Sequence, residues 1–169
     1  MNVLNNIINR LNYLIGEVPQ KIANIPGDEL AHKKAPDKWA KKEILGHLCD
    51  SAINNLSRFI RAQFERQPFQ VSGYEQDDWV KCNHYQEMPK TDIVDFWKSI
   101  NTRIVYVISK MPEEKLSVEC ELGDASFRDE GENKTLLWLI EDYLVHMEYH
   151  LKQIIEEDWL RNDYLTRRK

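Results

Sequence analysis

Residues 139–154 read LIEDYLVHMEYHLKQI, and this stretch decides the fold class that the sequence predicts. Apolar side chains recur in it every three or four positions, which is the spacing of a helix with one buried face. The apolar positions are Ile140, Leu144, Met147, Leu151 and Ile154. The stripe that they form predicts an amphipathic helix from about Thr135 to about Asp158.

Three earlier segments show the same helical spacing. The first carries its apolar stripe over residues 3–18, the second runs from about residue 39 to about residue 66, and the third spans 91–110 with Thr91 as a candidate N-cap. Prolines follow each of these segments, where helices are expected to end. Four long helices joined by turns predict an all-α, four-helix bundle, and the length of 169 residues fits a single domain covering 1–169.

The segment before the last helix lacks helical spacing. Val118 to Leu122 alternates between apolar and polar residues like a strand, and Gly123-Asp124 is typical of a turn. We therefore expect a short irregular or hairpin excursion within residues 116–132, just before the last helix.

The composition narrows the classes of protein to consider. With 42% hydrophobic and 30% charged residues the chain has the balance of a globular protein, and its net charge of -5 argues against a nucleic-acid partner. No apolar run is long enough for a membrane span, and the N-terminus does not resemble a signal peptide. The three cysteines, Cys49, Cys82 and Cys120, are odd in number and widely spaced. This usage predicts a reducing compartment, and therefore a cytoplasmic protein.

His146 and His150 are candidate metal ligands in the last helix. Four positions separate them, so both side chains lie on one face, about 6 Å apart along the axis, and can converge on one ion. They lie at the edge of the apolar stripe, beside Asp142 and Tyr143. This boundary between buried and solvated residues is where we expect the mouth of a pocket. Asp142 precedes His146 by one turn and could accept a hydrogen bond from its imidazole. An HxxxH spacing alone is a weak signal, because surface histidines also occur at this distance.

His47, in the second predicted helix, is the third candidate. A catalytic tetrahedral metal has three protein ligands and one open position. Several polar residues lie within about 60° of His47 on a helical wheel. They are Glu43, Asp50, Ser51, Asn54, Arg58 and Arg61. This polar stripe is either the solvated face of an amphipathic helix, which periodicity alone favours, or the wall of a cleft that loops cover, and composition does not decide between the two.

Three stretches together resemble the DinB-like family of bacterial metal-binding bundles. They are residues 39–51 (WAKKEILGHLCDS), residues 74–79 (YEQDDW) and residues 139–154. The resemblance covers most of the chain in the same order and implies a four-helix bundle. It also implies one divalent metal ion, zinc or nickel above all, held by His47, His146 and His150. The chain departs from the family at Ala40, where a serine is common, and this removes a hydroxyl that could cap the helix.

The resemblance further implies that the polar stripe around His47 faces the metal site. Substrate contacts are then expected from this stripe and from the loop before the third helix, which could cover the cleft. The candidates are Asn54, Arg58 or Arg61, Tyr74, Gln76 and Trp79. The residues expected to support the metal ligands from behind are Asp50, Asp142 and Tyr143.

The leading functional hypothesis is a metal-dependent enzyme. A divalent ion held by three neutral imidazoles lowers the pKa of a bound thiol or water and so produces a nucleophile. The DinB-like family includes bacillithiol S-transferases and proteins described as metal-dependent hydrolases. The chain has no HExxH motif, and Glu148, between the two histidines of the last helix, is rotated away from them. Transfer of a small-molecule thiol is therefore favoured over hydrolysis.

Other readings of the histidines stay open. The protein could be a non-catalytic binding or stress-response module that a metal stabilises, or its histidines could bind no metal. A closed site with four protein ligands favours a structural role, whereas an open position favours an enzyme. A homodimer is possible, since bundles of this type often associate through a helix face.

Overall fold

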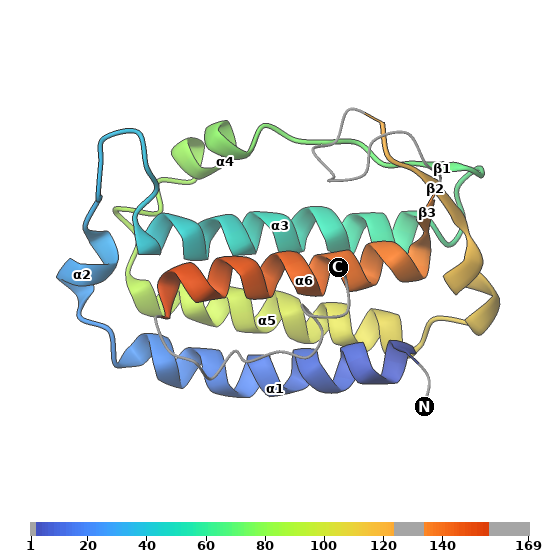
Figure 1. The fold of residues 1–169 in the computed structure, drawn as a ribbon, viewed down its shortest axis with the longest axis horizontal. Helices are drawn as coiled ribbons and strands as arrows, with labels where there is room; N and C mark the ends of the chain where they lie inside the picture. Colours follow the sequence, from blue (N-terminus) through green and yellow to red (C-terminus); the bar gives the residue numbers. More distant parts are fainter. Residues whose placement is uncertain (1–2, 124–133, 156–169) are drawn as a thin grey trace.

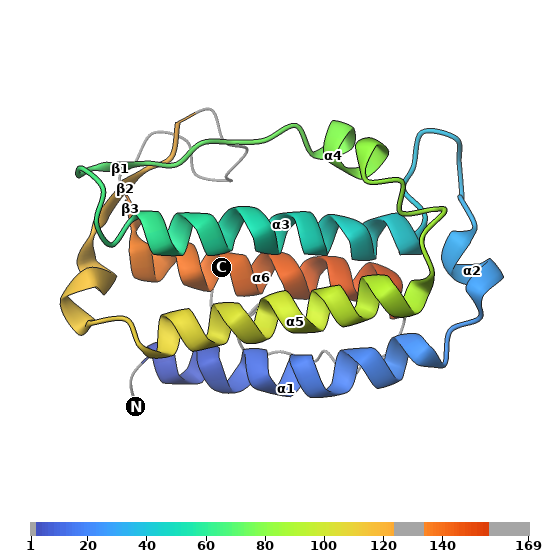
Figure 2. The ribbon, with the colours of Figure 1, turned by 180° about the vertical axis from the view of Figure 1, so that it is seen from behind.

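The computed structural model describes residues 3–123 and 134–155, and it is dominated by four long helices that lie side by side (Figures 1 and 2). They are α1 (Val3–Ala23), α3 (Lys41–Arg61), α5 (Lys90–Ser109) and α6 (Leu136–Ile154). The shorter helices are α2 (Gly27–Ala31), α4 (Gln76–Cys82) and the 3-10 helix η1 (Glu113–Ser117). The predicted all-α four-helix bundle is therefore confirmed.

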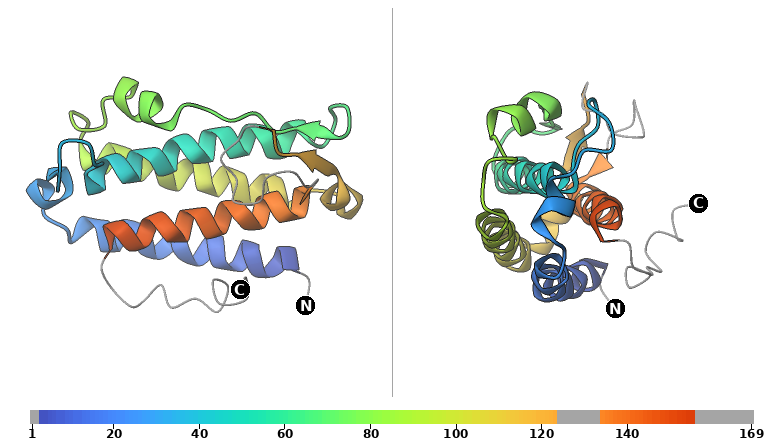
Figure 3. Two further views of the ribbon diagram at one scale, coloured as in Figure 1. Left: turned by 45° about the horizontal axis from the view of Figure 1, so that its top comes forward. Right: turned by 90° about the vertical axis from the view of Figure 1, so that its left-hand side faces the viewer.

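The four long helices surround one apolar core, as the end-on view in Figure 3 shows. α3 packs against α5 and α6, and α1 closes the bundle by packing against the same two helices. α1 contributes a regular stripe of buried residues. They are Leu4, Ile7, Leu11, Leu14, Val18 and Ile22. Each fully buried side chain of this kind stabilises the fold by roughly 1.5–3 kcal/mol, so the bundle rests mainly on this core.

The second long helix is shorter than its sequence pattern predicts. It begins at Lys41, after Ala40, whose N–H donates to the Glu43 carboxylate at 2.8 Å while its methyl side chain offers no cap. It ends at Arg61, because the next residues form tighter turn bonds: the Gln63 N–H donates to the Ile60 carbonyl. The predicted extension to residue 66 is therefore wrong.

The third long helix begins one residue earlier than predicted. Pro89 occupies the N-cap position with an extended backbone, and Lys90 is the first helical residue. Thr91 lies within the first turn, where its hydroxyl donates to the Asp92 carboxylate at 3.1 Å. The prediction of Thr91 as N-cap is wrong, because the extended backbone that an N-cap requires is found at Pro89.

The excursion before α6 is part of a small sheet. β2 (Glu119–Glu121) pairs antiparallel with β3 (Lys134–Thr135), so the predicted strand and its hairpin-like pairing are present. β2 also pairs in parallel with β1 (Phe69–Gln70), which the sequence did not predict, and Phe69 stands opposite Cys120. Residue 124 of the predicted turn and residue 158 at the predicted helix end lie outside the described residues. The sheet joins the chain that follows α3 to the chain that precedes α6, and so helps to hold these helices together.

The segment of residues 71–85, which we call the strap, runs along α3 on the outside of the bundle (Figures 1 and 3). It contains α4, and it ends at Tyr85, whose ring lies directly against Gly46. A Cβ atom on Gly46 would overlap that ring, so the absence of a side chain there allows the close approach. Within the described ranges, no helix is both long and apolar enough to span a membrane.

Candidate metal centre

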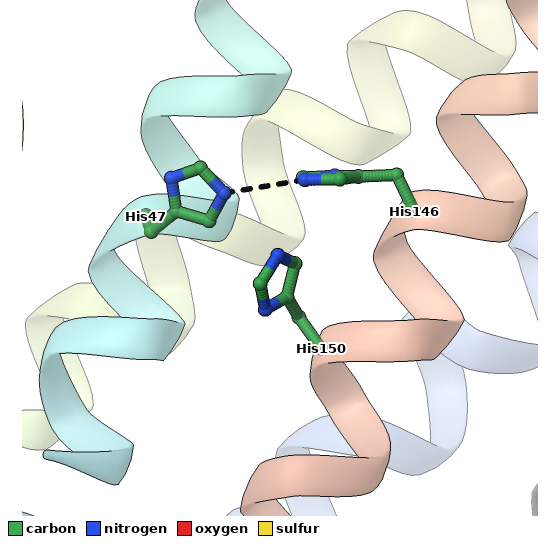
Figure 4. Close-up of side chains that lie close together, drawn as sticks. All are labelled: His47, His146 and His150. Carbon is green, nitrogen blue, oxygen red and sulfur yellow. Dashed lines mark hydrogen bonds between the residues drawn. The ribbon is translucent and has the colours of Figure 1, made fainter. Parts of the chain in front are cut away.

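His47, His146 and His150 converge between α3 and α6, as Figure 4 shows. Each offers a ring nitrogen, and these three atoms lie within 4.8 Å of one another. The Nε2 atoms of His47 and His146 are 3.3 Å apart. The ring centroid of His150 is 4.8 Å from that of His47 and 4.6 Å from that of His146. The structure thus brings together the three residues that were predicted as ligands.

This geometry fits a divalent transition metal. In a tetrahedral site with metal–nitrogen bonds of about 2.0–2.1 Å, two ligand nitrogens lie about 3.3–3.4 Å apart. The 3.3 Å between the Nε2 atoms of His47 and His146 agrees with this value, whereas the three ligand atoms together spread over up to 4.8 Å. Imidazole is a ligand that zinc, nickel, copper and iron share, so the donor set fits the class of metal and not one element.

Burial keeps two of the three imidazoles in the neutral form that binds metals. It lowers the pKa of His47 to about 3, and the charge of His150 adds to this effect. Burial also lowers the pKa of His150. A metal ion therefore has no proton to displace from these two histidines near neutral pH.

For two of the three histidines, a polar group lies near the ring nitrogen that faces away from the shared centre. The His150 Nδ1 lies 3.1 Å from the Gln153 side-chain oxygen, which can only accept, so Nδ1 donates and Nε2 is left bare. The His146 Nδ1 lies 3.4 Å from the Ser51 hydroxyl. The His47 Nδ1 is buried and has no hydrogen-bond partner among the described residues. The Trp39 ring instead covers His47, with the ring centroids 4.8 Å apart.

The polar stripe of α3 is buried, so it is a wall that other segments cover and not a solvated face. Its buried members are Glu43, His47, Asp50, Ser51, Asn55 and Arg58. The strap covers them and satisfies several of them: the Arg58 guanidinium donates to the Ser72 carbonyl at 2.5 Å. Arg61 is exposed and pairs with Glu65, which places it outside the cleft.

Asp50 is the most buried carboxylate of this wall, with no exposed surface. One of its oxygens accepts from the Tyr85 hydroxyl at 2.6 Å and from the Asn83 amide at 2.9 Å. The other oxygen is buried without a partner in the described structure. Burial raises the pKa of Asp50 to about 6, against the opposing effect of the Tyr85 hydrogen bond. Asp50 therefore joins the strap to α3.

The other predicted site residues on α3 and α6 are Asn54, Asp142 and Tyr143, and each of them interacts with a different residue. The half-buried Asn54 donates its amide to the Asp50 carbonyl at 2.9 Å. Asp142 interacts electrostatically with Arg58, and this opposes the lowering of the Arg58 pKa that burial causes. Tyr143 is buried and donates its hydroxyl to the Asn101 amide oxygen on α5 at 2.5 Å. Tyr143 thus points into the core and is not brought to the histidines.

The predicted residues of the strap are all half-buried. Tyr74 is half-buried, and burial raises its pKa. Its ring packs edge-to-face on Trp79, with centroids 5.3 Å apart. Gln76 and Trp79 are both half-buried in α4. The ring contact therefore joins the segment before α4 to α4 itself.

Glu148 lies between the two histidines of α6 in sequence but on another face of the helix. Its fully buried carboxylate accepts from the Arg10 guanidinium of α1 at 2.6 Å. The prediction that Glu148 is rotated away from the site is confirmed.

Known proteins resemble this chain in sequence and in fold. The model of the DinB superfamily matches residues 15–154, which is most of the chain. The chain belongs to the DinB superfamily. A protein of Halalkalibacterium halodurans named as a putative metal-dependent hydrolase is 25% identical over 124 residues, which cover 73% of this chain and 71% of that protein.

Two solved structures share the DinB fold. YfiT from Bacillus subtilis, described as a probable metal-dependent hydrolase with an unusual four-helix bundle topology, matches with a TM-score of 0.78 and 17% identity over 90% of this chain and 84% of its own. A mycothiol-dependent maleylpyruvate isomerase matches with a TM-score of 0.69 and 11% identity over 90% of this chain. The present chain spans 61% of that isomerase. At these identities the likeness concerns the fold.

In this DinB protein a pocket of about 340 Å³ lies apart from the three converging histidines, none of which lines it. It lies between the segment 33–39 and the α4 region, and its walls include Trp39 and Tyr85. Trp39 thus lines the pocket, and its ring also lies against that of His47. The volume is at the lower end of the range of small-molecule sites, about 300–1,000 Å³.

Several residues of the DinB site were not predicted in their observed roles. Ser51 lies one turn after His47, and Asn55 one turn after Ser51, so helical spacing places both near the histidine face. Gln153 follows His150 by three positions, which is another local signal. Tyr85 and Asn83 had no such signal, because their contact with Asp50 depends on the path of the strap.

Proposed function

We propose that this DinB protein is a divalent-metal-dependent enzyme that transfers a low-molecular-weight thiol to a carbon electrophile. The observation that carries the proposal is the ligand set: three imidazoles converge and two of them, His146 and His150, are only half-buried. Three protein ligands with access from one side leave a coordination position for a substrate, as in catalytic metal sites.

The neutral ligand set favours an anionic sulfur. The metal ion, when bound, lowers the pKa of the thiol that occupies its open position. The residues of the chain hold the imidazoles neutral, orient them and cover the cleft with the strap. In the reaction, the thiol loses its proton and its sulfur forms a bond to carbon. The bond from carbon to the leaving group, or to the oxygen of an epoxide, breaks, and that group takes the electron pair.

The fold likeness supports a thiol as the co-substrate. The similar isomerase is mycothiol-dependent, so a protein of this fold acts together with a small thiol. Zinc or nickel is the metal that we propose, because both bind imidazole well. Reducing conditions suit a thiol substrate, and the cytoplasm and a homodimer remain our predictions for its location and assembly.

Metal-dependent hydrolysis is the second candidate. The names of the Halalkalibacterium halodurans relative and of YfiT support it. Asp50 supports it as well, since its carboxyl has one oxygen without a partner in the described structure and lies one helical turn from His47. With a pKa near 6, this carboxyl is suited to accept a proton from water near neutral pH. His146 and His150 are only half-buried, so a substrate could reach a metal bound there. This argues against a non-catalytic module.

Metal analysis followed by two assays tests the proposal. We expect near-stoichiometric divalent metal in the untagged wild type by elemental analysis, and its loss in His47→Ala and His150→Ala. We then expect metal-dependent thiol consumption with an epoxide or alkyl halide in the wild type, and little ester or amide hydrolysis. His32→Ala, which removes an exposed histidine outside the site, is the matched control and should keep the metal.

The outcomes separate the candidates. Hydrolysis that requires both the metal and Asp50, with no thiol transfer, would favour the second candidate. A wild type that stays metal-free after incubation with zinc and nickel would contradict both enzymatic readings.

A further inference from the structure

Gln153 lies in the last turn of α6, three positions after the candidate ligand His150. Its side-chain oxygen is 3.1 Å from the His150 Nδ1. We propose that Gln153 is a positioning residue: it holds His150 in the tautomer that binds metal, and as an uncharged acceptor it leaves the bound ion most of its charge. The inference rests on the proposed function and concerns a residue that does not itself hold the metal.

The orientation of the His150 ring carries the first step. Figure 4 shows one ring nitrogen of His150 directed toward His47 and His146 and the other directed away from them. Gln153 contacts Nδ1, so Nε2 is the atom that is left for the ion. The Tyr149 ring meets the imidazole edge-on, with centroids 5.1 Å apart and planes at 78°. Gln153 and Tyr149 therefore both bear on how the His150 ring is turned.

The hydrogen of the neutral imidazole carries the second step. A neutral histidine has one ring hydrogen, on either Nδ1 or Nε2. An amide oxygen can only accept, so its contact with Nδ1 places the hydrogen there and leaves Nε2 bare. If the amide nitrogen of Gln153 faced Nδ1 instead, the hydrogen would be on Nε2 and would block the ion. Metal binding and the observed amide orientation therefore favour each other by the same factor.

The absence of charge on Gln153 carries the third step. Metal-binding histidines often donate their second N–H to a carboxylate, which makes the imidazole more basic. An amide oxygen carries no charge, and hydrogen bonds to neutral acceptors are about half as strong as those to ionised ones. The imidazole then gives the ion less electron density, and the ion keeps more of its charge for a bound thiol. Gln153 thus favours activation of the substrate over the tightest metal binding.

The exposure of Gln153 makes this role testable, because substitutions there leave the core intact. Methionine and glutamate resemble glutamine in length, and all three are good helix formers. Gln153→Met removes the acceptor, whereas Gln153→Glu makes it anionic. Lys152 is exposed in the same turn. Lys152→Gln is the matched control, since it lowers the net charge by one, as Gln153→Glu does, without changing the group that contacts His150.

Zinc affinity of the full chain, measured by chelator competition, tests the positioning. We expect Gln153→Met to weaken zinc binding by about 10-fold, the lower end of the usual effect of losing a group that orients a histidine ligand. Gln153→Glu should strengthen it by about 10-fold, because the hydrogen bond becomes charge-assisted. Lys152→Gln should stay within about two-fold of the wild type, since exposed charges are screened. At saturating zinc, kcat/KM for thiol transfer should fall in Gln153→Glu and stay at the wild-type value in Lys152→Gln.

Nitrogen NMR of the imidazoles tests the tautomer in the metal-free protein, at a pH where His150 is neutral. The wild type should carry the His150 hydrogen on Nδ1, and Gln153→Met should lose this preference. Circular dichroism checks that each variant is as helical as the wild type. Wild-type zinc affinity or an unchanged tautomer in Gln153→Met would overturn the positioning role.

The remaining outcomes concern the charge of the acceptor and the metal site itself. An equal gain of zinc affinity in Gln153→Glu and Lys152→Gln would overturn the role of the uncharged acceptor, and so would faster thiol transfer in Gln153→Glu. A wild type with the hydrogen on Nδ1 that binds no zinc would contradict the proposed function, and with it the role of Gln153 in metal binding.

Discussion

His47 and His146 face each other through their Nε2 atoms at 3.3 Å, although 99 positions separate them in the chain. Their contact joins α3 to α6, the two helices that flank the candidate metal centre (Figure 4). Both nitrogens point at the same space, and His150 approaches it from the next turn of α6. The fold therefore builds the candidate metal centre from two helices that are far apart in the sequence.

His47 should make the metal-free protein less stable as the pH falls. Its pKa is about 3 in the folded protein and 6.5 in the reference state, so between these values unfolding takes up a proton. The free energy of unfolding should then decrease by about 1.4 kcal/mol for each pH unit below that reference value. His47→Gln removes this term, so the stability difference between variant and wild type should shift in favour of the variant as the pH falls. Urea unfolding of the metal-free proteins across this window is the measurement, and parallel pH curves for the two would contradict the prediction.

Asp50 should contribute a pH dependence of the opposite sign. Its pKa rises from 3.8 to about 6 on folding, so in this window the folded protein holds a proton that the unfolded chain has released. This contribution is full below the reference value and is lost as the pH rises through about 6. In Asp50→Asn the amide oxygen can still accept from Tyr85, and the variant should gain stability relative to the wild type as the pH rises through the window. The same urea titration measures it, and a gain toward low pH would show that the sign is wrong.

Gly46→Ala should loosen the strap. The added methyl group would overlap the Tyr85 ring and push it away from Asp50. We expect a loss of about 1–3 kcal/mol in the free energy of unfolding, the usual effect of overpacking. Gly16→Ala is the control, since Gly16 lies exposed within α1 with nothing near its added Cβ. That substitution should stabilise the protein by about 0.5–1 kcal/mol in the same denaturant experiment. Equal effects at both glycines would refute the close Tyr85 contact.

Glu148→Gln should affect stability and spare the metal site. The Glu148 carboxylate is fully buried and pairs with Arg10 of α1, away from the imidazoles. Replacing it by an amide weakens a buried ion pair, so we expect a loss of about 1–3 kcal/mol in unfolding free energy. Zinc affinity should stay within about two-fold of the wild type, a change worth less than one hydrogen bond. A large loss of zinc binding or of metal-dependent turnover, with unchanged stability, would instead place Glu148 in the site.

Local patterns predicted the long helices well and their ends less well. The apolar stripe of α1 is buried as its spacing requires. Prolines mark the ends only loosely: α3 ends at Arg61, before Pro68, and Pro89 itself takes the N-cap position that Thr91 was predicted to fill. Helix ends depend on the bonds that the last few backbone groups find, and several arrangements of these cost similar free energies.

The sequence by itself determined that His146 and His150 share one helix face, because helical geometry relates residues four positions apart. It also left the polar stripe around His47 ambiguous, since a solvated face and a cleft wall have the same periodicity. Only the tertiary structure excluded the solvated face, by laying the strap over α3 and burying Asp50 and Ser51. The same packing turned Tyr143 toward Asn101 and brought Tyr85 to Asp50. These contacts join residues from different elements, and local spacing carries no information on which elements meet.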